Sequence, residues 1–286
     1  TIMAKPNIAT EKKSFFPTSI SNEVHAQREK LFKVSESIRN GKLRSFSGEK
    51  YTSLLVLGIG GSDLGPRMAV KALSSLSRSI NVSFVSNIDP SELSRQSLDL
   101  YPNKTLVIIS SKTFTTSETI SNADATYEWM SEHIGEEAAK FQRLGVTANI
   151  NNAKNFGLKD KQIIGFSNWV GGRSSIWSGI GIPLAISIGQ KHFEEFLAGG
   201  FSIDTHVKEN MSNSIPSLMA IIGYIHRNYI GSSSHCIVPY DSNLAYLPSY
   251  LQQLEMESNG KSVSINGDFI KYHSAPVIWG LVGTDS

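Results

Sequence analysis

The sequence predicts an α/β fold with a parallel sheet that helices cover on both faces. Short, almost continuous apolar runs at residues 53–57 and 105–109, and a further strand candidate at 81–86, alternate with segments of helical spacing. Strands of this composition are typical of parallel sheets that are buried on both sides. The overall composition agrees, because 40% hydrophobic and 18% charged residues suit an ordinary packed core.

The first element along the chain is an amphipathic helix at residues 23–39, whose apolar side chains fall on one face and which Gly41 ends. The residues before about 20 mix Lys, Ser, Thr and Pro without a period, which predicts an arm or loop. In the alternation that follows we expect helices over 64–76, 92–100, 117–133 and 176–189, and two weaker strands at 148–150 and 163–166.

A second alternation begins after the glycine pair Gly199-Gly200, which we interpret as a boundary. Its expected elements are a helix at 214–229, a strand at 236–239 and a helix at 244–256. The sequence ends at Ser286, soon after this alternation starts, so we expect a second α/β domain that is present only in part. The predicted organisation is an arm and helix at 1–43, a first domain at 44–190 and the start of a second domain at 191–286.

The most apolar stretch, residues 215–230, predicts a buried helix rather than a membrane span, because His226 and Arg227 interrupt it and it is too short. The start of the sequence lacks the long apolar region of a secretory signal. Cys236 is the only cysteine, which excludes an internal disulfide and a thiolate metal cage. These features predict a cytoplasmic protein.

The charge balance limits the partners. A formal net charge of +2, from 27 basic and 25 acidic residues, gives no broad field for nucleic acid or an anionic membrane. An anionic ligand therefore needs a local site. The seven histidines show none of the spacings typical of metal ligands, so we predict no metal site.

The first candidate ligand loop is Gly58-Ile59-Gly60-Gly61-Ser62-Asp63, which joins an apolar strand to a helix. Ligands of open α/β sheets bind outside the carboxyl ends of the strands. The glycines permit a tight turn and a close backbone approach to a ligand. The pattern is neither a dinucleotide fingerprint nor a P-loop, so this loop is either a packing turn or a ligand loop.

The second candidate loop, Ser110 to Thr116, crowds serines and threonines around a lysine at a strand-to-helix turn. Hydroxyls and free N–H groups at the positive end of a helix suit a phosphate monoester. The alternative is an ordinary helix N-cap, which needs only one of these hydroxyls. Two such loops on neighbouring strands could form one pocket, with phosphate on the second loop and sugar hydroxyls near the first.

Two charged side chains are candidates for the chemistry. Arg173, between a glycine pair and a serine pair, suits a guanidinium that stabilises a developing oxyanion, and the alternative is a surface or ion-paired arginine. Glu257, near a helix end that Gly260 closes, could be a general base if burial raises its pKa. The alternative for Glu257 is a solvated glutamate. Glu255 lies two residues away and faces another side of the helix, so a paired-carboxylate site is not expected.

Six segments taken together resemble the glucose-6-phosphate isomerase family. In chain order they are LGIGGSDLGP, FVSNID, SSKTFTTSET, NWVGGRSSIWS, LPSYLQQLEMESNGK and APVIWG, and the resemblance covers about residues 41–286. It implies a three-layer αβα sandwich of the sugar isomerase (SIS) type, present twice in the family. It also implies reversible conversion of glucose 6-phosphate and fructose 6-phosphate through a cis-enediol, without a cofactor, and an enzyme that is usually a homodimer.

The resemblance assigns roles to nine residues of this chain. Phosphate binding is implied for Ser111, Thr113 and Thr116, with Lys112 offering its backbone N–H and Gln253 lying near the phosphate. Substrate contact is implied for Gly61 and Ser62, stabilisation of the enediolate for Arg173, and proton transfer between C1 and C2 for Glu257.

The sequence departs from the family pattern in three places, and the first is the segment before Glu23, which matches the family poorly. Ser174 stands where the family has an aromatic residue after GGR. The family's ring-opening histidine and active-site lysine would fall beyond Ser286. Two other interpretations remain open: a non-catalytic sugar-phosphate-binding module of the same fold, and an isomerase of another hexose phosphate such as mannose 6-phosphate. Phosphate binding needs neither Arg173 nor Glu257, so their presence favours an enzyme.

Overall fold

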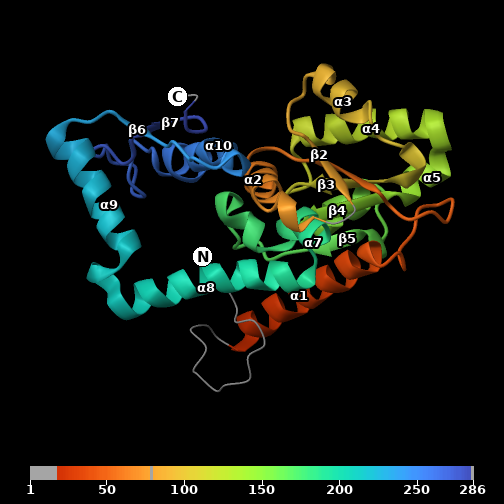
Figure 1. The fold of residues 1–286 in the computed structure, drawn as a ribbon, viewed down its shortest axis with the longest axis horizontal. Coiled ribbons are helices and arrows are strands. Elements are labelled where there is room, and N and C mark those ends of the chain that lie inside the picture. Colours follow the sequence, from red (N-terminus) through yellow and green to blue (C-terminus); the bar gives the residue numbers. More distant parts are fainter. Residues whose placement is uncertain (1–17, 78–79, 285–286) are drawn as a thin grey trace.

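The computed structural model describes residues 18–77 and 80–284 and contains a five-stranded parallel sheet. The strand order is β2-β1-β3-β4-β5 (Figure 1). The strands are β1 Ser53–Leu57, β2 Asn81–Val85, β3 Thr105–Ser110, β4 Arg143–Thr147 and β5 Ile163–Gly165. The three strands predicted at 53–57, 81–86 and 105–109 are therefore confirmed as β1, β2 and β3.

Each central strand buries side chains on both faces of the sheet. Leu54 and Val56 of β1 point into one apolar cluster, whereas Leu55 and Leu57 point into the other. All four side chains are at most 1% exposed. This two-sided burial explains why the strand is apolar at every position instead of alternating.

Two layers of helices enclose the sheet and confirm the predicted three-layer αβα sandwich (Figure 1). The cluster on the Leu54 side includes residues of α1 Thr18–Arg39, α2 Leu64–Ala72, α7 Ile182–Ile188 and α8 Gln190–Asn210. The opposite cluster packs against α3 Pro90–Ser97, α4 Ser117–Ile134, α5 Glu136–Phe141 and α6 Ile150–Asn155. Most of the predicted arm lies outside the described residues, and α1 begins earlier than the expected helix.

The second α/β unit is present in part, as predicted. It contains α9 Ile215–Ile225, α10 Leu247–Leu251 and a two-stranded parallel sheet of β6 Ser234–Cys236 and β7 Val277–Trp279. The strand expected at 236–239 corresponds to β6, which begins two residues earlier, at Ser234, and ends at Cys236. The helix expected at 244–256 is divided, because α10 continues as the π-helical segment Gln252–Glu257.

Three local predictions are wrong. Residues 148–150 are not a strand, because the Asn149 side chain accepts a hydrogen bond from the Asn152 N–H and caps α6. The helix expected at 176–189 begins with 3₁₀ turns and becomes α-helical only at Ile182. Gly199 and Gly200 do not interrupt α8, so they mark no break in the chain's secondary structure. The domain limits at 43 and 190 stay predictions.

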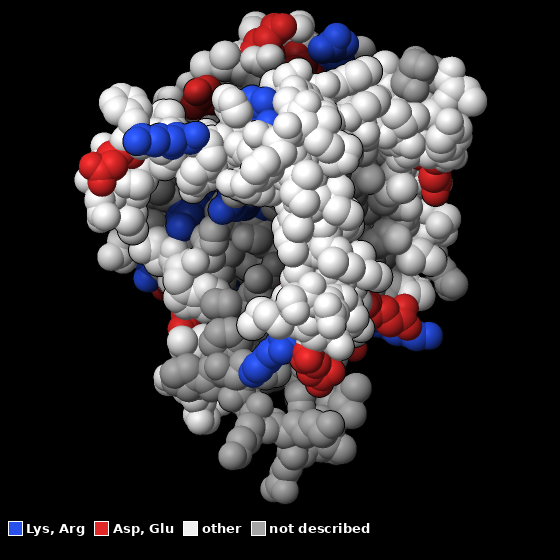
Figure 2. All heavy atoms as spheres, turned by 90° about the vertical axis from the view of Figure 1, so that its left-hand side faces the viewer, with Lys and Arg blue, Asp and Glu red and all other residues white. Residues whose placement is uncertain are grey.

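Helix α9 is exposed, which contradicts the predicted buried helix. None of its residues is buried, and its Ile215, Met219 and Ile222 side chains are each more than half exposed. The helix contains no charged residue, and the face that Figure 2 presents is largely uncharged over its centre. In Figure 1 α9 extends away from the sheet, so no described element lies over its apolar side. Among the described helices, none is long and apolar enough to cross a membrane.

The two-sided core predicts a large difference between two leucine truncations. Leu54→Ala, at a side chain that is 0% exposed, should lower the free energy of unfolding by about 2–5 kcal/mol, because it leaves a cavity in the apolar cluster on its side of the sheet. Leu98→Ala, at a side chain that is 80% exposed, should change it by less than about 0.5 kcal/mol. Urea unfolding measures both, and equal losses would contradict the assigned core.

Candidate active site

The two candidate loops adjoin at the carboxyl edge of the sheet. Leu57, the last residue of β1, pairs in register with Ile109 of β3. A Cβ at Gly58 would lie 3.1 Å from the Ser110 carbonyl oxygen, so the loops start side by side. The prediction that they follow neighbouring parallel strands is confirmed.

The first loop contacts the segment that carries Arg173. Gly61 meets Gly172 backbone to backbone, since a Cβ at Gly61 would come 2.0 Å from the Gly172 carbonyl oxygen. The Ser175 hydroxyl also donates a hydrogen bond to the Gly61 carbonyl at 2.9 Å. Gly61 is therefore a position where the close contact of two backbone segments leaves no room for a side chain. Ser62, next in the 3₁₀ turn Gly60–Ser62, is half-buried at the same edge.

The first loop also contacts the π-helical segment Gln252–Glu257. Gly60 has a φ of +57°, and a Cβ there would lie 2.8 Å from the Gln253 Nε2 atom. The Gln253 Oε1 atom is buried and accepts no hydrogen bond from the described residues. Gln253 thus lies against the first loop, with an unused acceptor at the site. Short π-helical stretches are frequent at functional sites.

Arg173 is attached to the segment that carries Glu257. Its Nη1 donates to the Asn259 Oδ1 atom at 2.9 Å, and the Tyr250 hydroxyl donates to the Arg173 carbonyl at 3.3 Å. Burial raises the pKa of Tyr250. Within residues 18–77 and 80–284 no carboxylate lies within ion-pair distance of Arg173. The described residues therefore do not support the alternative that Arg173 is an ion-paired arginine.

Glu257 is exposed in this chain. Its Oε2 atom accepts a hydrogen bond from the Ser258 hydroxyl at 2.8 Å, and its carbonyl accepts one from the Lys261 ammonium at 2.9 Å. The described residues therefore do not bury this carboxylate. Glu257 belongs to the segment Gln252–Glu257, and both Arg173 and the first loop contact this segment. This shared segment links Glu257 to the site.

The second loop was predicted at Ser110–Thr116, and its first residue is the last residue of β3. The remaining Ser111–Thr116 is a compact hydroxyl cluster, which is called the hydroxyl loop below. The Ser111 and Thr116 hydroxyls are hydrogen-bonded at 3.0 Å, and the Thr115 hydroxyl donates to the Thr113 hydroxyl at 2.9 Å. Thr116 is the N-cap residue of α4, yet its side chain makes no capping hydrogen bond. The N-cap alternative therefore does not explain this hydroxyl, and the positive end of α4 faces the loop.

The hydroxyl loop contains a strained residue at its centre. Phe114 has a φ of +55°, an uncommon conformation for a residue with a side chain. Its ring is buried and meets Phe156 edge to face at 5.6 Å, which anchors the strained backbone. Strain of this kind persists where packing determines the local conformation, and it is frequent at binding sites.

Several contacts that position this loop were not predicted from the sequence. Asn152 donates to the Thr113 carbonyl at 2.8 Å, and Thr147 donates to the Lys112 carbonyl at 3.0 Å. The Lys112 ammonium donates to the Val170 carbonyl at 3.0 Å, so it points toward the chain after β5. A hollow of about 330 Å³ adjoins Lys112 and Thr113. The Asn-rich turn after β4 was the sequence signal for this support.

The described residues contain no group of three or more His, Cys, Asp or Glu side chains that could hold a metal ion. The polar groups that the candidate loops and segments bring to the carboxyl edge include hydroxyls, amides, the Arg173 guanidinium and the Glu257 carboxylate. This set suits hydrogen bonding to a sugar phosphate and movement of a proton.

The αβα sandwich with a hydroxyl loop at the carboxyl edge of its sheet places the protein among the SIS-type phosphosugar isomerase folds. A sequence profile described as phosphoglucose isomerase matches residues 8–286. The chain belongs to the phosphoglucose isomerase family.

Individual relatives agree with this assignment. The glucose-6-phosphate isomerase of Methylocella silvestris is 43% identical over 264 residues, which cover 92% of this chain and 48% of the relative. That of Bartonella bacilliformis is 42% identical over 93% of this chain and 49% of the relative. The crystal structure of the Chlamydia trachomatis glucose-6-phosphate isomerase superposes with a TM-score of 0.84 at 29% identity, over 96% of this chain and 52% of that one. The chain spans about half the length of the curated relatives it matches.

The backbone contact at Gly61 predicts a selective effect of an added methyl group. Gly61→Ala should lower the free energy of unfolding by about 1–3 kcal/mol, because the Gly172 backbone must move away. Gly172→Ala is the matched control, since a Cβ at Gly172 meets nothing within 4 Å. Thermal unfolding compares the two variants, and equal melting temperatures would refute the close approach.

Proposed function

We propose that this chain supplies the phosphate-binding and base-bearing part of a glucose-6-phosphate isomerase. Its reaction is the interconversion of glucose 6-phosphate and fructose 6-phosphate. The observation that carries the proposal is the convergence of the first loop, the Arg173 segment and the Gln253–Glu257 segment beside the hydroxyl loop. Relatives named glucose-6-phosphate isomerase support the catalytic proposal over a binding module.

The phosphate group would bind at the hydroxyl loop. Ser111, Thr113 and Thr116 offer hydroxyls, Lys112 offers its backbone N–H, and the N-terminus of α4 adds a positive potential. An anion at this position gains charge-assisted hydrogen bonds that a neutral ligand lacks. The loop is therefore suited to the dianionic end of a hexose 6-phosphate.

The sugar would extend toward the first loop and the Arg173 segment. Gly61 and Ser62 lie where its hydroxyls would bind, and the free Gln253 Oε1 acceptor is available to a hydroxyl or to the phosphate side of the substrate. Binding of the sugar over this edge would also cover the exposed Glu257 carboxylate, which supplies part of the desolvation that a base needs.

Proton transfer would use Glu257 and Arg173 together. Glu257 takes the proton from C2 of the open-chain aldose, and the electrons move to give the cis-enediolate. The Arg173 guanidinium stabilises the negative oxygen of that intermediate. Transfer of the O2 hydroxyl proton to O1 and return of the carbon-bound proton to C1 give the ketose, so one carboxylate serves both carbons. Ring opening would use groups of the family that fall beyond Ser286, and the enzyme would act as a cytoplasmic homodimer.

The proposed base predicts a loss of turnover without a loss of binding. Glu257→Gln should lower turnover of fructose 6-phosphate by at least about a hundredfold, because it removes the proton acceptor and keeps the side-chain volume. The dissociation constant for fructose 6-phosphate should stay within about threefold.

Glu255→Gln is the matched control, since this carboxylate lies two residues away on the same segment. An assay that couples glucose 6-phosphate formation to NADP reduction measures both variants in the complete enzyme. Full turnover by the Glu257 variant would exclude this residue as the base.

The hydroxyl loop predicts a phosphate-specific loss of affinity. Thr116→Val removes one hydroxyl at nearly constant volume and should weaken fructose 6-phosphate binding about tenfold, the effect of one hydrogen bond to a charged group. Fructose, which lacks the phosphate, should bind both forms equally weakly. Calorimetric titration of the folded variant tests this, and an unchanged affinity for fructose 6-phosphate would place the phosphate elsewhere.

A further inference from the structure

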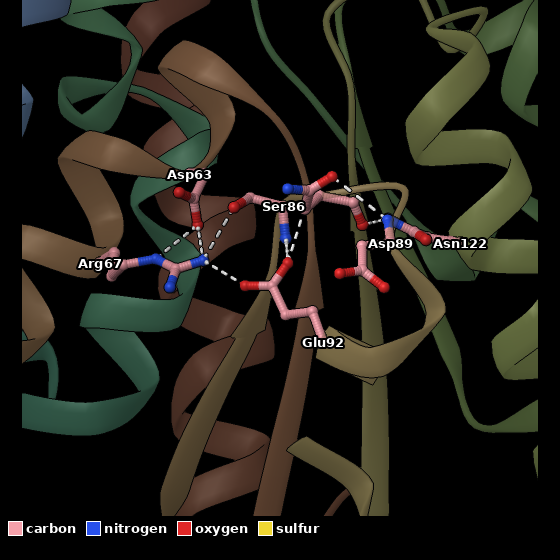
Figure 3. A network of polar contacts seen from close by, with 7 residues as sticks. Asp63, Arg67, Ser86, Asp89, Glu92 and Asn122 are labelled. Carbon is pink, nitrogen blue, oxygen red and sulfur yellow. Dashed lines mark hydrogen bonds and ion pairs between the residues drawn. The ribbon is translucent and has the colours of Figure 1, made fainter. Parts of the chain in front are cut away.

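One guanidinium bridges two carboxylates directly behind the first loop (Figure 3). The Arg67 Nε atom donates to Asp63 Oδ1 at 2.9 Å, and its Nη2 atom lies 2.9 Å from the same oxygen. Nη2 also lies 3.6 Å from Glu92 Oε1 and donates to the Ser86 hydroxyl at 3.1 Å. Asp63 follows Ser62, and Ser86 follows β2, so Arg67 attaches the first loop to the chain after the neighbouring strand.

The three charged side chains are largely removed from water. Their exposed fractions are 4% for Asp63, 17% for Arg67 and 16% for Glu92. Burial raises the pKa of Asp63, although the nearby Arg67 guanidinium acts in the opposite direction. Charges in such surroundings remain favourable only in a well-formed geometry, because loss of one partner leaves the other buried and unpaired. The arrangement therefore depends on the planar fork of an arginine.

The polar contacts continue from Glu92 to helix α4. Glu92 Oε2 accepts hydrogen bonds from the Ser86 N–H at 2.9 Å and the Asn87 N–H at 2.7 Å. The Asn87 carbonyl in turn accepts a hydrogen bond from Asn122 Nδ2 at 2.9 Å. Asn122 belongs to α4, the helix whose N-terminus bears the hydroxyl loop. A continuous series of contacts thus joins the helix behind the phosphate position to the loop at the sugar position.

Aromatic rings fix the guanidinium from two further elements. Arg67 Cζ lies 5.4 Å from the centroid of the Phe84 ring and 5.9 Å from that of the Tyr246 ring. Phe84 is in β2, whereas Tyr246 immediately precedes α10 and the segment with Gln253. Arg67 therefore contacts both α/β units of the chain.

We propose that Arg67 is a positioning residue that sets the Gly60–Ser62 turn for the sugar. Through Glu92 and Asn122 it also fixes the distance from that turn to the hydroxyl loop. The proposal rests on the proposed function, because it assumes that the sugar of a hexose phosphate binds at this turn. It predicts that a change at Arg67 weakens recognition of the sugar and spares recognition of the phosphate.

The test compares two ligands on the complete enzyme that contains this chain. Isothermal titration with fructose 6-phosphate and with inorganic phosphate is carried out on the parent, on Arg67→Lys and on Arg95→Lys. Lysine keeps the charge and loses the fork that spans both carboxylates. We expect Arg67→Lys to raise the dissociation constant for fructose 6-phosphate about tenfold and that for inorganic phosphate by less than about twofold. Arg95, exposed on α3, is the matched control and should change neither.

Two results would overturn the positioning role: equal affinity of Arg67→Lys and the parent for fructose 6-phosphate, or an equal loss for both ligands. Should Arg67→Lys fail to fold, Glu92→Gln decides in its place, because it weakens the same bridge and keeps an acceptor for Ser86 and Asn87. Glu92→Gln should then weaken binding of fructose 6-phosphate and leave binding of inorganic phosphate nearly unchanged. Absence of this difference refutes the proposal. A parent chain that binds inorganic phosphate and not fructose 6-phosphate, or neither ligand, would instead contradict the proposed function.

Discussion

The site depends on the approach of two backbones at Gly61 and Gly172. No side chain fits between them, since a Cβ at Gly61 would come 2.0 Å from the Gly172 carbonyl oxygen. This contact brings the segment after β5 against the loop after β1, and Ser175 closes it with a hydrogen bond. Arg173 then reaches Asn259, and the segment with Gln253 and Glu257 is held at the same edge of the sheet. Residues far apart in sequence form one site because the glycine at position 61 allows this approach to the Gly172 carbonyl.

The hydroxyl loop is organised by a different constraint. Its turn places the buried Phe114 at a positive φ, and the ring is anchored against Phe156. Asn152 and Thr147 hold two of its carbonyls. The buried Ser111 hydroxyl accepts a hydrogen bond from the Phe114 N–H at 3.1 Å and is hydrogen-bonded to the Thr116 hydroxyl at the start of α4. Apolar packing and these hydrogen bonds thus stabilise a backbone that would otherwise be unfavourable.

The sequence predicted the sheet well where a strand is buried on both faces, because β1 and β3 are almost continuous apolar runs. The edge strand β2 was also predicted, although it contains Asn81 and Ser83 and buries only Phe84 and Val85. It missed β4, which starts with Arg143 and contains Gly145. That glycine is required by packing, since a Cβ there would come 2.4 Å from the Leu158 Cδ1 atom. Arg143 in turn stacks over the Tyr127 ring at 5.1 Å. Such tertiary reasons cannot be recognised in a local pattern.

The candidate site, like the sheet, could be predicted from the sequence only in part. The motifs around Gly61, Thr113 and Arg173 were identifiable by their residue types, because glycines and hydroxyls after apolar strands indicate ligand loops. The contacts that join them were not, since Ser175 and Gly61 are 114 positions apart, and Arg173 and Asn259 are 86 apart. The Asp63–Arg67 pair had a recognisable spacing of four residues, although nothing in the sequence pointed to Glu92 as its second partner.

A crystal structure of the complete enzyme with bound fructose 6-phosphate tests the central claim most directly. The account predicts phosphate oxygens within hydrogen-bond distance of the Ser111, Thr113 and Thr116 hydroxyls, with C1 and C2 of the sugar beside the Glu257 carboxylate. A phosphate bound away from the hydroxyl loop, with Glu257 still directed into water, would contradict it.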